Sequence, residues 1–265
     1  MSKRLAGVAG LVVALAVVLW LAAPLWPGRS AAGEGGPKPA TRTAPATWHR
    51  PRSASRSAER RAMVRRQIEG RGIRSAAVLD ALRHVPRHEF VPTGIDRRAY
   101  DDSPLPIGHG QTISQPYIVA FMTEALDLKP GDRVLEVGTG SGYQAAVLAE
   151  LTPNVHTIEI VRALGKQAAA RLTRLGYKTV RTRVADGYFG WPDAAPFDAI
   201  IVTCAAGSVP PPIVQQLKPG GRLCIPVGPP GHVQQLVLVS KDAEGAVRSK
   251  SLMAVVFVPL TRKVR

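Results

Sequence analysis

The stretch from Val134 to Tyr143 constrains the fold of this chain more than any other part of it. It begins with a short apolar strand pattern, passes through Gly138, Gly140 and Gly142, and then enters a helical pattern. A strand that runs through a glycine-rich turn into a helix brings its backbone close to a bound ligand. Tyr143 stands where the dinucleotide fingerprint would have its third glycine, so the pattern departs from that of NAD-binding proteins.

Strand and helix patterns alternate after this turn, which favours a parallel sheet with helices packed against it. The last two strands are separated only by polar residues and predict an antiparallel hairpin. We therefore expect an α/β fold with a doubly wound, mostly parallel seven-stranded sheet and an antiparallel C-terminal hairpin. The expected strands are 133–137, 155–159, 179–185, 197–203, 222–227, 233–240 and 252–258, and the expected helices are 141–151, 162–175 and 213–217.

Two further helices are predicted before the glycine turn. Ser75 suits an N-cap, and the apolar stripe that follows it stops before a proline, after which residues 85–92 read as a loop. The second helix follows Ser114 and stops at residues 129–132, where the sequence is Lys-Pro-Gly-Asp. Ser114 precedes a helix with an early proline, so it also reads as an N-cap.

Acidic side chains stand at or near the ends of three successive predicted strands. Glu136 lies two residues before the first glycine of the turn, Glu159 lies 21 residues after Gly138, and Asp186 follows the third strand. At the second strand an acid can accept hydrogen bonds from the hydroxyls of a ribose, and at the third it can bind the amino group of an adenine. Each acid alone reads as a surface residue, but together with the glycine turn they predict a nucleoside cofactor.

Charge and cysteine content exclude several classes of function. The formal net charge is +16, of which residues 1–66 contribute +10 with 12 Lys and Arg against 2 acids. These basic residues are interleaved with Ser, Ala and Pro rather than with aromatic residues, which argues against nucleic-acid binding. Two cysteines, Cys204 and Cys224, cannot build a disulfide framework or a four-thiolate zinc site. The histidines show no metal-ligand spacing, so we expect no metal.

Several longer strings resemble the S-adenosylmethionine-dependent methyltransferases, and within them the protein-L-isoaspartate O-methyltransferases. The resemblance covers roughly residues 62–258 and implies a Rossmann-like methyltransferase fold. The string QTISQP at residues 111–116 is particular to this family, whereas the glycine turn is common to methyltransferases generally. The strings that carry the resemblance, besides the glycine turn, lie at residues 63–73, 85–92, 106–116, 196–203 and 217–222.

The resemblance implies a repair enzyme that transfers a methyl group from S-adenosylmethionine to the α-carboxylate of L-isoaspartyl residues in damaged proteins and peptides. Alignment is the main task, because a carboxylate is already a nucleophile and a sulfonium is already a good leaving group. The family's catalytic serine falls on Ser114, which would orient the carboxylate with help from Thr112. The N-cap reading of Ser114 is compatible with this role, since a helix N-terminus favours an anion. The resemblance also implies the cofactor-binding residues, which are Glu136, Gly138, Thr139, Gly140, Ser141, Gly142, Glu159, Asp186 and Gly187. Thr203 is expected to line the pocket.

Two alternatives stay open at this point. The first keeps the cofactor and changes the acceptor to a small molecule or an RNA base, which a basic, aromatic-lined face would favour. The second is a membrane-tethered binding module that has kept the fold without catalysis. Cys204 stands where the family usually has a small residue such as alanine, in a region expected to line the substrate groove. We expect a monomer whose partners are isoaspartyl proteins and peptides.

The N-terminal residues predict a membrane segment. Lys3 and Arg4 precede an uncharged apolar run that reaches Trp26, long enough to cross a bilayer as a helix. Residues 1–26 therefore read as a transmembrane anchor or a signal segment, and small residues at 30–32 leave cleavage open. Residues 27–57 read as a disordered basic tether rich in Pro, Ala and Ser, and residues 58–265 as the methyltransferase domain. We expect a protein that is membrane-tethered or exported, on an undetermined side of the membrane, with the family's usual cytoplasmic location as the alternative.

Overall fold

The computed structural model describes residues 48–262 of the 265-residue chain. The membrane segment predicted at residues 1–26 and most of the tether predicted at 27–57 lie outside the described residues. Within the part that is described, no helix is both long enough and apolar enough to cross a membrane. The α-helices are α1 (Ser57–Met63), α2 (Ala76–His84), α3 (Pro116–Leu126), α4 (Tyr143–Ala149), α5 (Arg162–Arg174) and α6 (Pro211–Gln215). The shorter turns of 3₁₀ or π helix are η1 (Val64–Ile68), η2 (Glu69–Arg71), η3 (Arg87–Phe90), η4 (Asp96–Arg98), η5 (Gly187–Phe189) and η6 (Pro192–Ala194).

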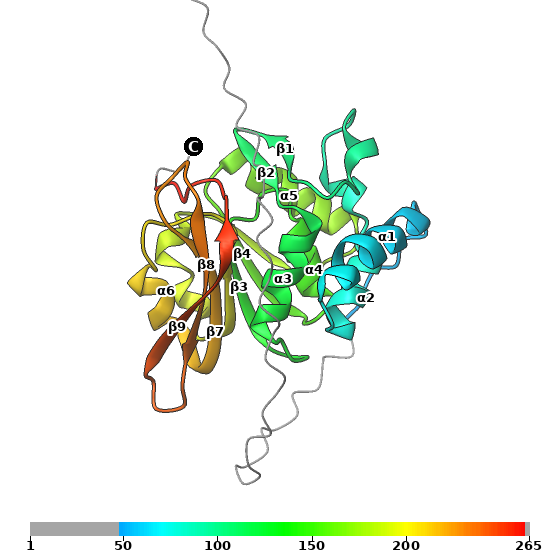
Figure 1. Ribbon diagram of the computed structural model, residues 1–265. Helices are drawn as coiled ribbons and strands as arrows, with labels where there is room; N and C mark the ends of the chain where they lie inside the picture. The colour runs from blue at the N-terminus through cyan, green and yellow to red at the C-terminus, as the bar shows by residue number, and fades with distance from the viewer. Residues whose placement is uncertain (1–47, 263–265) are drawn as a thin grey trace, which may run out of the picture. The chain divides into compact units, whose positions relative to one another are not determined.

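A seven-stranded sheet forms the centre of the folded domain, with the strand order β5-β4-β3-β6-β7-β8-β9 (Figure 1). The strands from β5 to β7 in this order run parallel to one another. β8 and β9 form an antiparallel hairpin added to β7. This arrangement confirms the predicted doubly wound α/β fold. The strands of the sheet are β3 (Arg133–Val137), β4 (Asn154–Glu159), β5 (Arg181–Val184), β6 (Phe197–Val202), β7 (Leu217–Val227), β8 (Gln234–Lys241) and β9 (Val247–Val255).

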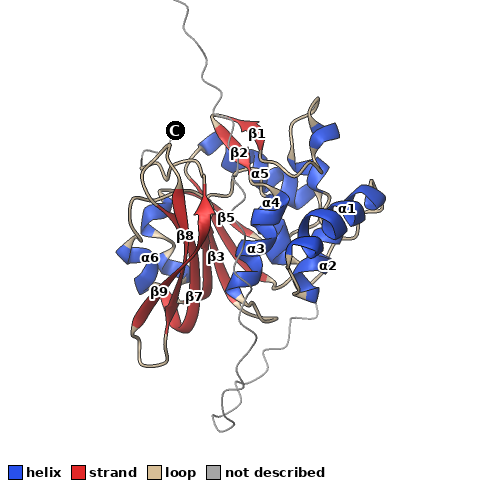
Figure 2. Ribbon diagram, in the orientation of Figure 1, coloured by secondary structure: helices blue, strands red, loops and turns tan. Residues whose placement is uncertain are grey.

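Both faces of the sheet are buried, and β3 shows how the sequence achieves this. Alternate residues of a strand face opposite sides of a sheet. Val134 belongs to a core cluster that includes residues of α1 to α5, whereas Leu135 and Val137 belong to a second cluster that includes Ile213 of α6. A parallel strand covered on both faces reads as a nearly continuous apolar run. Figure 2 shows the helices on the two sides of the sheet.

The structure corrects several predicted boundaries. The last strand is β9, at residues 247–255 rather than 252–258. Its first part, residues 247–251, is mostly polar and charged and pairs through its backbone, so it leaves no apolar pattern. α4 begins only at Tyr143, since Gly142 is still in the left-handed region with φ 89°. Ser75 is confirmed as an N-cap that accepts a hydrogen bond from the Val78 amide. The N-cap reading of Ser114 is wrong by one residue, because Gln115 is the N-cap of α3.

A small hairpin that the sequence did not predict precedes α3. Its strands are β1 (Leu105–Gly108) and β2 (Gln111–Ile113), which pair antiparallel and form a separate two-stranded sheet. The turn between them passes through Gly108, His109 and Gly110, all with positive φ. In Figure 1 this hairpin lies above the end of the large sheet at which the parallel strands finish.

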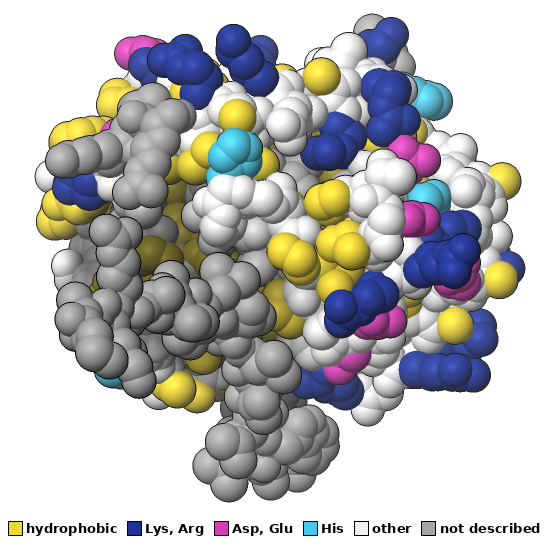
Figure 3. Space-filling view, turned by 90° about the horizontal axis from the view of Figure 1, so that it is seen from above, with side chains coloured by type: hydrophobic (Ala, Val, Ile, Leu, Met, Phe, Trp, Pro, Cys, Tyr) yellow, Lys and Arg dark blue, Asp and Glu magenta, His cyan; other side chains and the backbone are white. Residues whose placement is uncertain are grey.

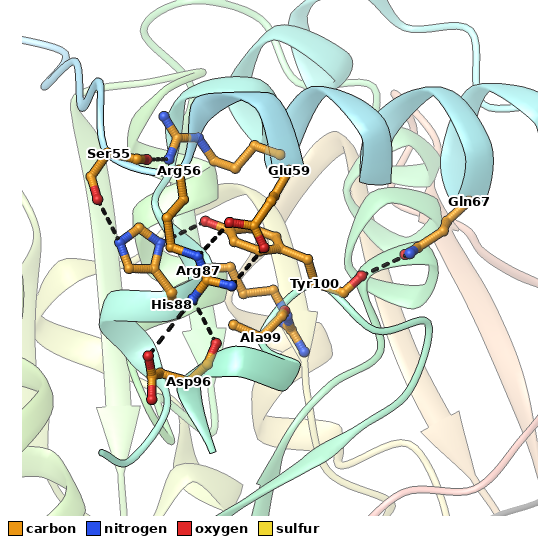
Figure 4. A network of polar contacts seen from close by, with 10 residues as sticks. Ser55, Arg56, Glu59, Gln67, Arg87, His88, Asp96, Ala99 and Tyr100 are labelled. Carbon is orange, nitrogen blue, oxygen red and sulfur yellow. Dashed lines mark hydrogen bonds and ion pairs between the residues drawn. The ribbon is translucent and has the colours of Figure 1, made fainter. Parts of the chain in front are cut away.

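Residues 48–57, the described end of the predicted tether, lie against the folded domain. The Trp48 indole N–H donates a hydrogen bond to the Ala149 carbonyl, and Arg52 forms an ion pair of 2.6 Å with the buried carboxylate of Glu150. Further along, the buried Arg60 guanidinium donates to the carbonyls of Ser53 and Ser55. Figure 4 shows the continuation of this network, in which the labelled side chains of Arg56, Glu59, His88 and Tyr100 gather around the start of α1.

Candidate active site

The glycine turn after β3 is held against the end of the neighbouring strand β4. The amides of Gly138 and Thr139 both donate to the Ile158 carbonyl, at 2.8 and 3.1 Å. Gly138 has φ 101°, and a Cβ placed on it would lie 2.5 Å from the Thr203 hydroxyl oxygen. That hydroxyl itself lies 2.6 Å from the Gly138 carbonyl oxygen, to which it donates. Thr203 therefore occupies the space that a side chain at position 138 would need.

Glu159, at the end of β4, joins the glycine turn to the start of the next loop. One carboxylate oxygen accepts a hydrogen bond from the Gly140 amide at 2.7 Å, and the other accepts one from the Val161 amide at 2.8 Å. A carboxylate offers about four acceptor positions, so each oxygen keeps capacity for a ligand hydroxyl. The side chain lines a cavity, in the position that sequence reasoning assigned to a ribose-binding acid.

Glu136 lies beneath this turn instead of in the cavity wall. Its side chain is fully buried, and the Thr157 hydroxyl donates to its Oε2 at 2.5 Å while the Thr139 hydroxyl contacts Thr157 at 2.6 Å. Burial raises the pKa of Glu136 to about 8, against the opposing effect of the Thr157 hydrogen bond and with a smaller contribution from the nearby charge of Glu159. The Oε1 atom has no partner among the described residues. Glu136 is therefore placed to support the turn through the two threonines.

Asp186 and Gly187 follow β5 at the next position along the edge. The Asp186 carboxylate accepts a hydrogen bond from the Tyr188 amide at 3.0 Å and forms an ion pair of 2.8 Å with Arg262. Gly187 lines the cavity, and a Cβ placed on it would lie 2.4 Å from the Val137 side chain. Glycine at this position therefore lets the backbone pack against Val137 in the cavity wall.

The hairpin β1–β2 supplies the wall on another side. Gln111 and Thr112 line the cavity, whereas Ser114 lies two residues further along, half-buried at the junction with α3. Within the described residues, no hydrogen bond involves the Ser114 hydroxyl, which leaves it available to a ligand. Thr112 therefore lines the cavity, whereas Ser114 does not.

All these segments meet in one cavity at the carboxyl edge of the parallel strands. It holds about 530 Å³ of space not filled by protein atoms, a volume that includes the open solvent at its mouth. Figure 3 shows this end of the molecule. In the visible part, Lys and Arg side chains lie mostly toward the edge, and neutral and hydrophobic side chains occupy much of the centre. The lining residues are Gln111, Thr112, Val137, Gly138, Gly140, Ile158, Glu159, Ile160, Val161, Gly187, Thr203, Cys204, Val258, Pro259, Leu260 and Thr261.

The cavity brings together Thr203 and five of the eleven predicted site residues, and it adds one segment. Gly138, Gly140, Glu159, Gly187 and Thr112 line it directly. The predicted residues that do not line it are Ser114, Glu136, Thr139, Ser141, Gly142 and Asp186.

Residues 258–261 form part of the wall although no motif marked them. The only signal in the sequence was that an apolar string, Val-Pro-Leu, follows the last strand. The other cysteine, Cys224, is buried in β7, away from the residues that line the cavity. Across the described residues, no group of three or more His, Cys, Asp or Glu side chains is arranged to hold a metal.

Comparisons with known proteins identify the family to which this chain belongs. Residues 58–265 match the family model described as protein-L-isoaspartate(D-aspartate) O-methyltransferase. The chain belongs to this family. A protein-L-isoaspartate O-methyltransferase of Opitutus terrae is 58% identical over 217 residues, which cover 82% of this chain and 93% of the relative. Protein-L-isoaspartate O-methyltransferase 1 of Nitrosospira multiformis is 56% identical over 210 residues, with 78% and 89% of the two chains covered.

A solved structure of the same family has the same fold. The crystal structure of a protein-L-isoaspartate O-methyltransferase homologue from Plasmodium falciparum, in complex with S-adenosyl-L-homocysteine, matches with a TM-score of 0.67 and 26% identity. The match covers 76% of this chain and 98% of that one. As a protein-L-isoaspartate O-methyltransferase, this chain is an enzyme that uses S-adenosylmethionine to methylate isoaspartyl residues in protein repair.

Proposed function

We propose that the cavity at the carboxyl edge of the sheet is where this enzyme binds S-adenosylmethionine and methylates the α-carboxylate of L-isoaspartyl residues in damaged proteins and peptides. The observation that carries the proposal is the meeting of two sets of residues. The glycine turn and Glu159, which suit a nucleoside, line the same cavity as Thr112, two residues before Ser114. Cofactor site and acceptor site would therefore be neighbours.

The chemistry leaves the protein with little acid-base work. When bound, S-adenosylmethionine supplies a methyl group attached to a positively charged sulfur, which is a good leaving group. An acceptor carboxylate oxygen forms the new bond to the methyl carbon as the carbon–sulfur bond breaks, with no proton to remove. The protein's contribution is to hold the acceptor oxygen in line with that methyl carbon and to exclude water.

The cofactor side is assigned by fit to the residues present. Glu159 has acceptor capacity for the two ribose hydroxyls, and its hydrogen bond with the Gly140 amide fixes it to the turn that would cradle the rest of the cofactor. Gly187 lines the cavity where the adenine would lie, with Asp186 next to it as the acceptor for the adenine amino group. Glu136 acts as a positioning residue through Thr157 and Thr139. The remaining residues of the turn, Thr139, Ser141 and Gly142, contribute its backbone shape.

The acceptor side is assigned to the hairpin β1–β2 and the start of α3. The half-buried Ser114 hydroxyl can donate a hydrogen bond to one oxygen of the substrate carboxylate, which leaves the other oxygen directed at the methyl group. Thr112 is exposed and lines the cavity, so its hydroxyl can assist from the side of the cofactor. The two hydroxyls would therefore orient the acceptor without changing its charge.

The test is methyl transfer from labelled S-adenosylmethionine by the full chain to two peptides of one sequence, one with L-isoaspartate and one with L-aspartate. We expect labelled methyl ester on the isoaspartyl peptide only. Equal labelling of both peptides, or labelling of neither by a chain that binds the cofactor, would contradict the assignment of the acceptor.

A second experiment tests the cofactor side alone. Replacing Glu159→Gln removes the negative charge that receives the ribose hydroxyls, and we expect binding of S-adenosyl-L-homocysteine to weaken by roughly 10- to 100-fold, the equivalent of about 1.5–3 kcal/mol for hydrogen bonds to a charged group. Glu244→Gln, an exposed site in the turn between β8 and β9, is the matched control. An affinity of the Glu159→Gln variant within twofold of wild type would refute the assignment.

Membrane attachment and oligomeric state belong to the proposal as well. On the sequence of residues 1–26 we propose a membrane-tethered or exported enzyme, and we propose that it acts as a monomer, with residues 58–265 as the catalytic domain. Release of full-length, uncleaved chain from membranes by alkaline carbonate would contradict the tether. Elution at twice the mass of the chain in light scattering would contradict the monomer.

A further inference from the structure

The last described residues, Val258 to Arg262, cross the carboxyl edge of the sheet, and we call them the C-terminal strap. The strap is fixed at one end by two backbone hydrogen bonds of 2.8 Å. The Ala205 amide donates to the Val258 carbonyl, and the Leu260 amide donates to the Ala205 carbonyl. Because Ala205 follows β6, this end of the strap is anchored beside that strand.

The far end of the strap is fixed by one side chain. The Arg262 Nε donates to the Asp186 carboxylate at 2.8 Å. Its guanidinium carbon lies 3.8 Å from the ring centroid of Tyr188 and 5.0 Å from that of Phe189. The side chains of Arg262 and Asp186 are 48% and 16% exposed. This attachment is an ion pair with cation–π contacts near the surface, so it can open without disturbing the core.

The position of these two attachments in the sheet matters for the site. Asp186 follows β5 and Ala205 follows β6, and the order β5-β4-β3-β6 places the ends of β4 and β3 between them. Those ends carry Glu159 and the glycine turn, and residues 258–261 of the strap line the same cavity. The strap therefore spans the proposed cofactor site from one side to the other.

We propose that Arg262 is a further determinant of cofactor binding, which fastens the C-terminal strap over the cavity and so sets the rates at which the cofactor enters and leaves. The inference rests on the proposed function in one respect, namely that the cavity is the cofactor site. The two sequence positions concerned, Asp186 and Arg262, are 76 residues apart, and the second is outside every motif that suggested the activity. Arg262 is a positioning residue, since it acts through the strap and Asp186.

The test uses the full chain and S-adenosyl-L-homocysteine, with association and dissociation followed by stopped-flow fluorescence and no methyl acceptor present. For Arg262→Ala we expect dissociation about tenfold faster, the combined effect of one half-exposed ion pair and its cation–π contacts, and a smaller increase in the association rate. Arg262→Lys keeps the charge but loses the planar stacking, so it should fall between wild type and alanine.

Two readouts separate this role from a merely structural one. Dissociation from wild type should accelerate as salt rises from about 50 to about 500 mM, because the half-exposed ion pair is screened, whereas dissociation from Arg262→Ala should not change with salt. In a double-mutant cycle with Tyr188→Leu, the effects on dissociation should be less than additive, because both substitutions remove the same contact.

The matched control is Arg248→Ala, which removes the same charge from the exposed strand β9, in register with Ser240 and toward the opposite end of the strands. It should leave both rates unchanged. Dissociation from Arg262→Ala within twofold of wild type, or equal to that of the control, would overturn the proposal and leave the cofactor assignment standing. A wild-type chain that bound no S-adenosyl-L-homocysteine would overturn the cofactor assignment, and this proposal with it.

Discussion

The contact between Gly138 and Thr203 gives the sharpest quantitative test of how the glycine turn is built. The perturbation is Gly138→Ala, made in the wild-type chain and in a Thr203→Ala background. In the wild type the new Cβ would lie 2.5 Å from the Thr203 hydroxyl oxygen, whereas its next neighbours, the Thr203 Cβ and the Cys204 sulfur, are at an ordinary 3.7 Å. Removing the hydroxyl therefore removes the overlap and leaves only the backbone strain.

The two costs can be estimated separately. Alanine at φ 101° costs about 1–2 kcal/mol relative to glycine in the left-handed region. Displacing the Thr203 hydroxyl breaks its hydrogen bond to the Gly138 carbonyl and adds about 1–2 kcal/mol. We therefore expect Gly138→Ala to lower the free energy of unfolding by about 3 kcal/mol in the wild type. In the Thr203→Ala background it should lower it by only about 1–2 kcal/mol.

The assay is urea unfolding of the four proteins in the cycle, with the affinity for S-adenosyl-L-homocysteine measured on each. The coupling between the two substitutions should be about 1–2 kcal/mol in the direction that makes the double variant more stable than the sum predicts. Equal costs of Gly138→Ala in the two backgrounds, within about 0.5 kcal/mol, would refute the reasoning. It would mean that the turn relaxes around the new side chain.

Three other expectations follow from buried ionisable groups. Because burial raises the pKa of Glu136 from 4.5 to about 8, the folded chain binds a proton that the unfolded chain releases. The contribution of Glu136 to the free energy of unfolding therefore falls by about 3 kcal/mol as the pH rises from about 5 to about 8. Urea unfolding of Glu136→Gln should lack that slope, and an unchanged slope would contradict the assignment. Arg52→Ala should lower the free energy of unfolding by about 1–3 kcal/mol, because it removes the ion-pair partner of the buried Glu150 carboxylate. The control is Arg61→Ala, at an exposed position. An equal loss of unfolding free energy in the two variants would contradict the role of the ion pair. Burial raises the pKa of both cysteine thiols to about 12, so neither should react with a thiol reagent at pH 8 until the protein is unfolded.

The sequence predicted the parallel part of the sheet well because local and global signals agree there. Residues 133–137 include the apolar Val134, Leu135 and Val137 and are followed by glycines, and β3 occupies the range that this pattern predicted. The outer hairpin was predicted less accurately. β9 begins at Val247, where Arg248 and Lys250 are exposed and only backbone pairing defines the strand. Periodicity does not detect an outer strand whose side chains face water on both sides.

The candidate site, like the sheet, was predicted from the sequence only in part. Glu159 and the glycines were found from the sequence because strand ends and glycine spacing are local features. Spacing could not tell that Glu136 lies under the turn, because that depends on the partners of a buried side chain in the neighbouring strand. The C-terminal strap was missed for a similar reason, since the pairing of Arg262 with Asp186 is a contact across the fold that no local pattern encodes.

The arrangement of two adjoining sites is best tested by the turnover of the Ser114→Ala variant on an isoaspartyl peptide at saturating S-adenosylmethionine. In this arrangement, the cofactor and the acceptor carboxylate occupy neighbouring positions, and Ser114 serves only the acceptor. It predicts that kcat falls by about 10²-fold or more, the usual cost of removing a hydrogen bond that aligns the reacting group, while the affinity for S-adenosyl-L-homocysteine stays within twofold of wild type. An unchanged kcat would contradict the placement of the acceptor at Ser114, and a matching loss of cofactor affinity would contradict the separation of the two sites.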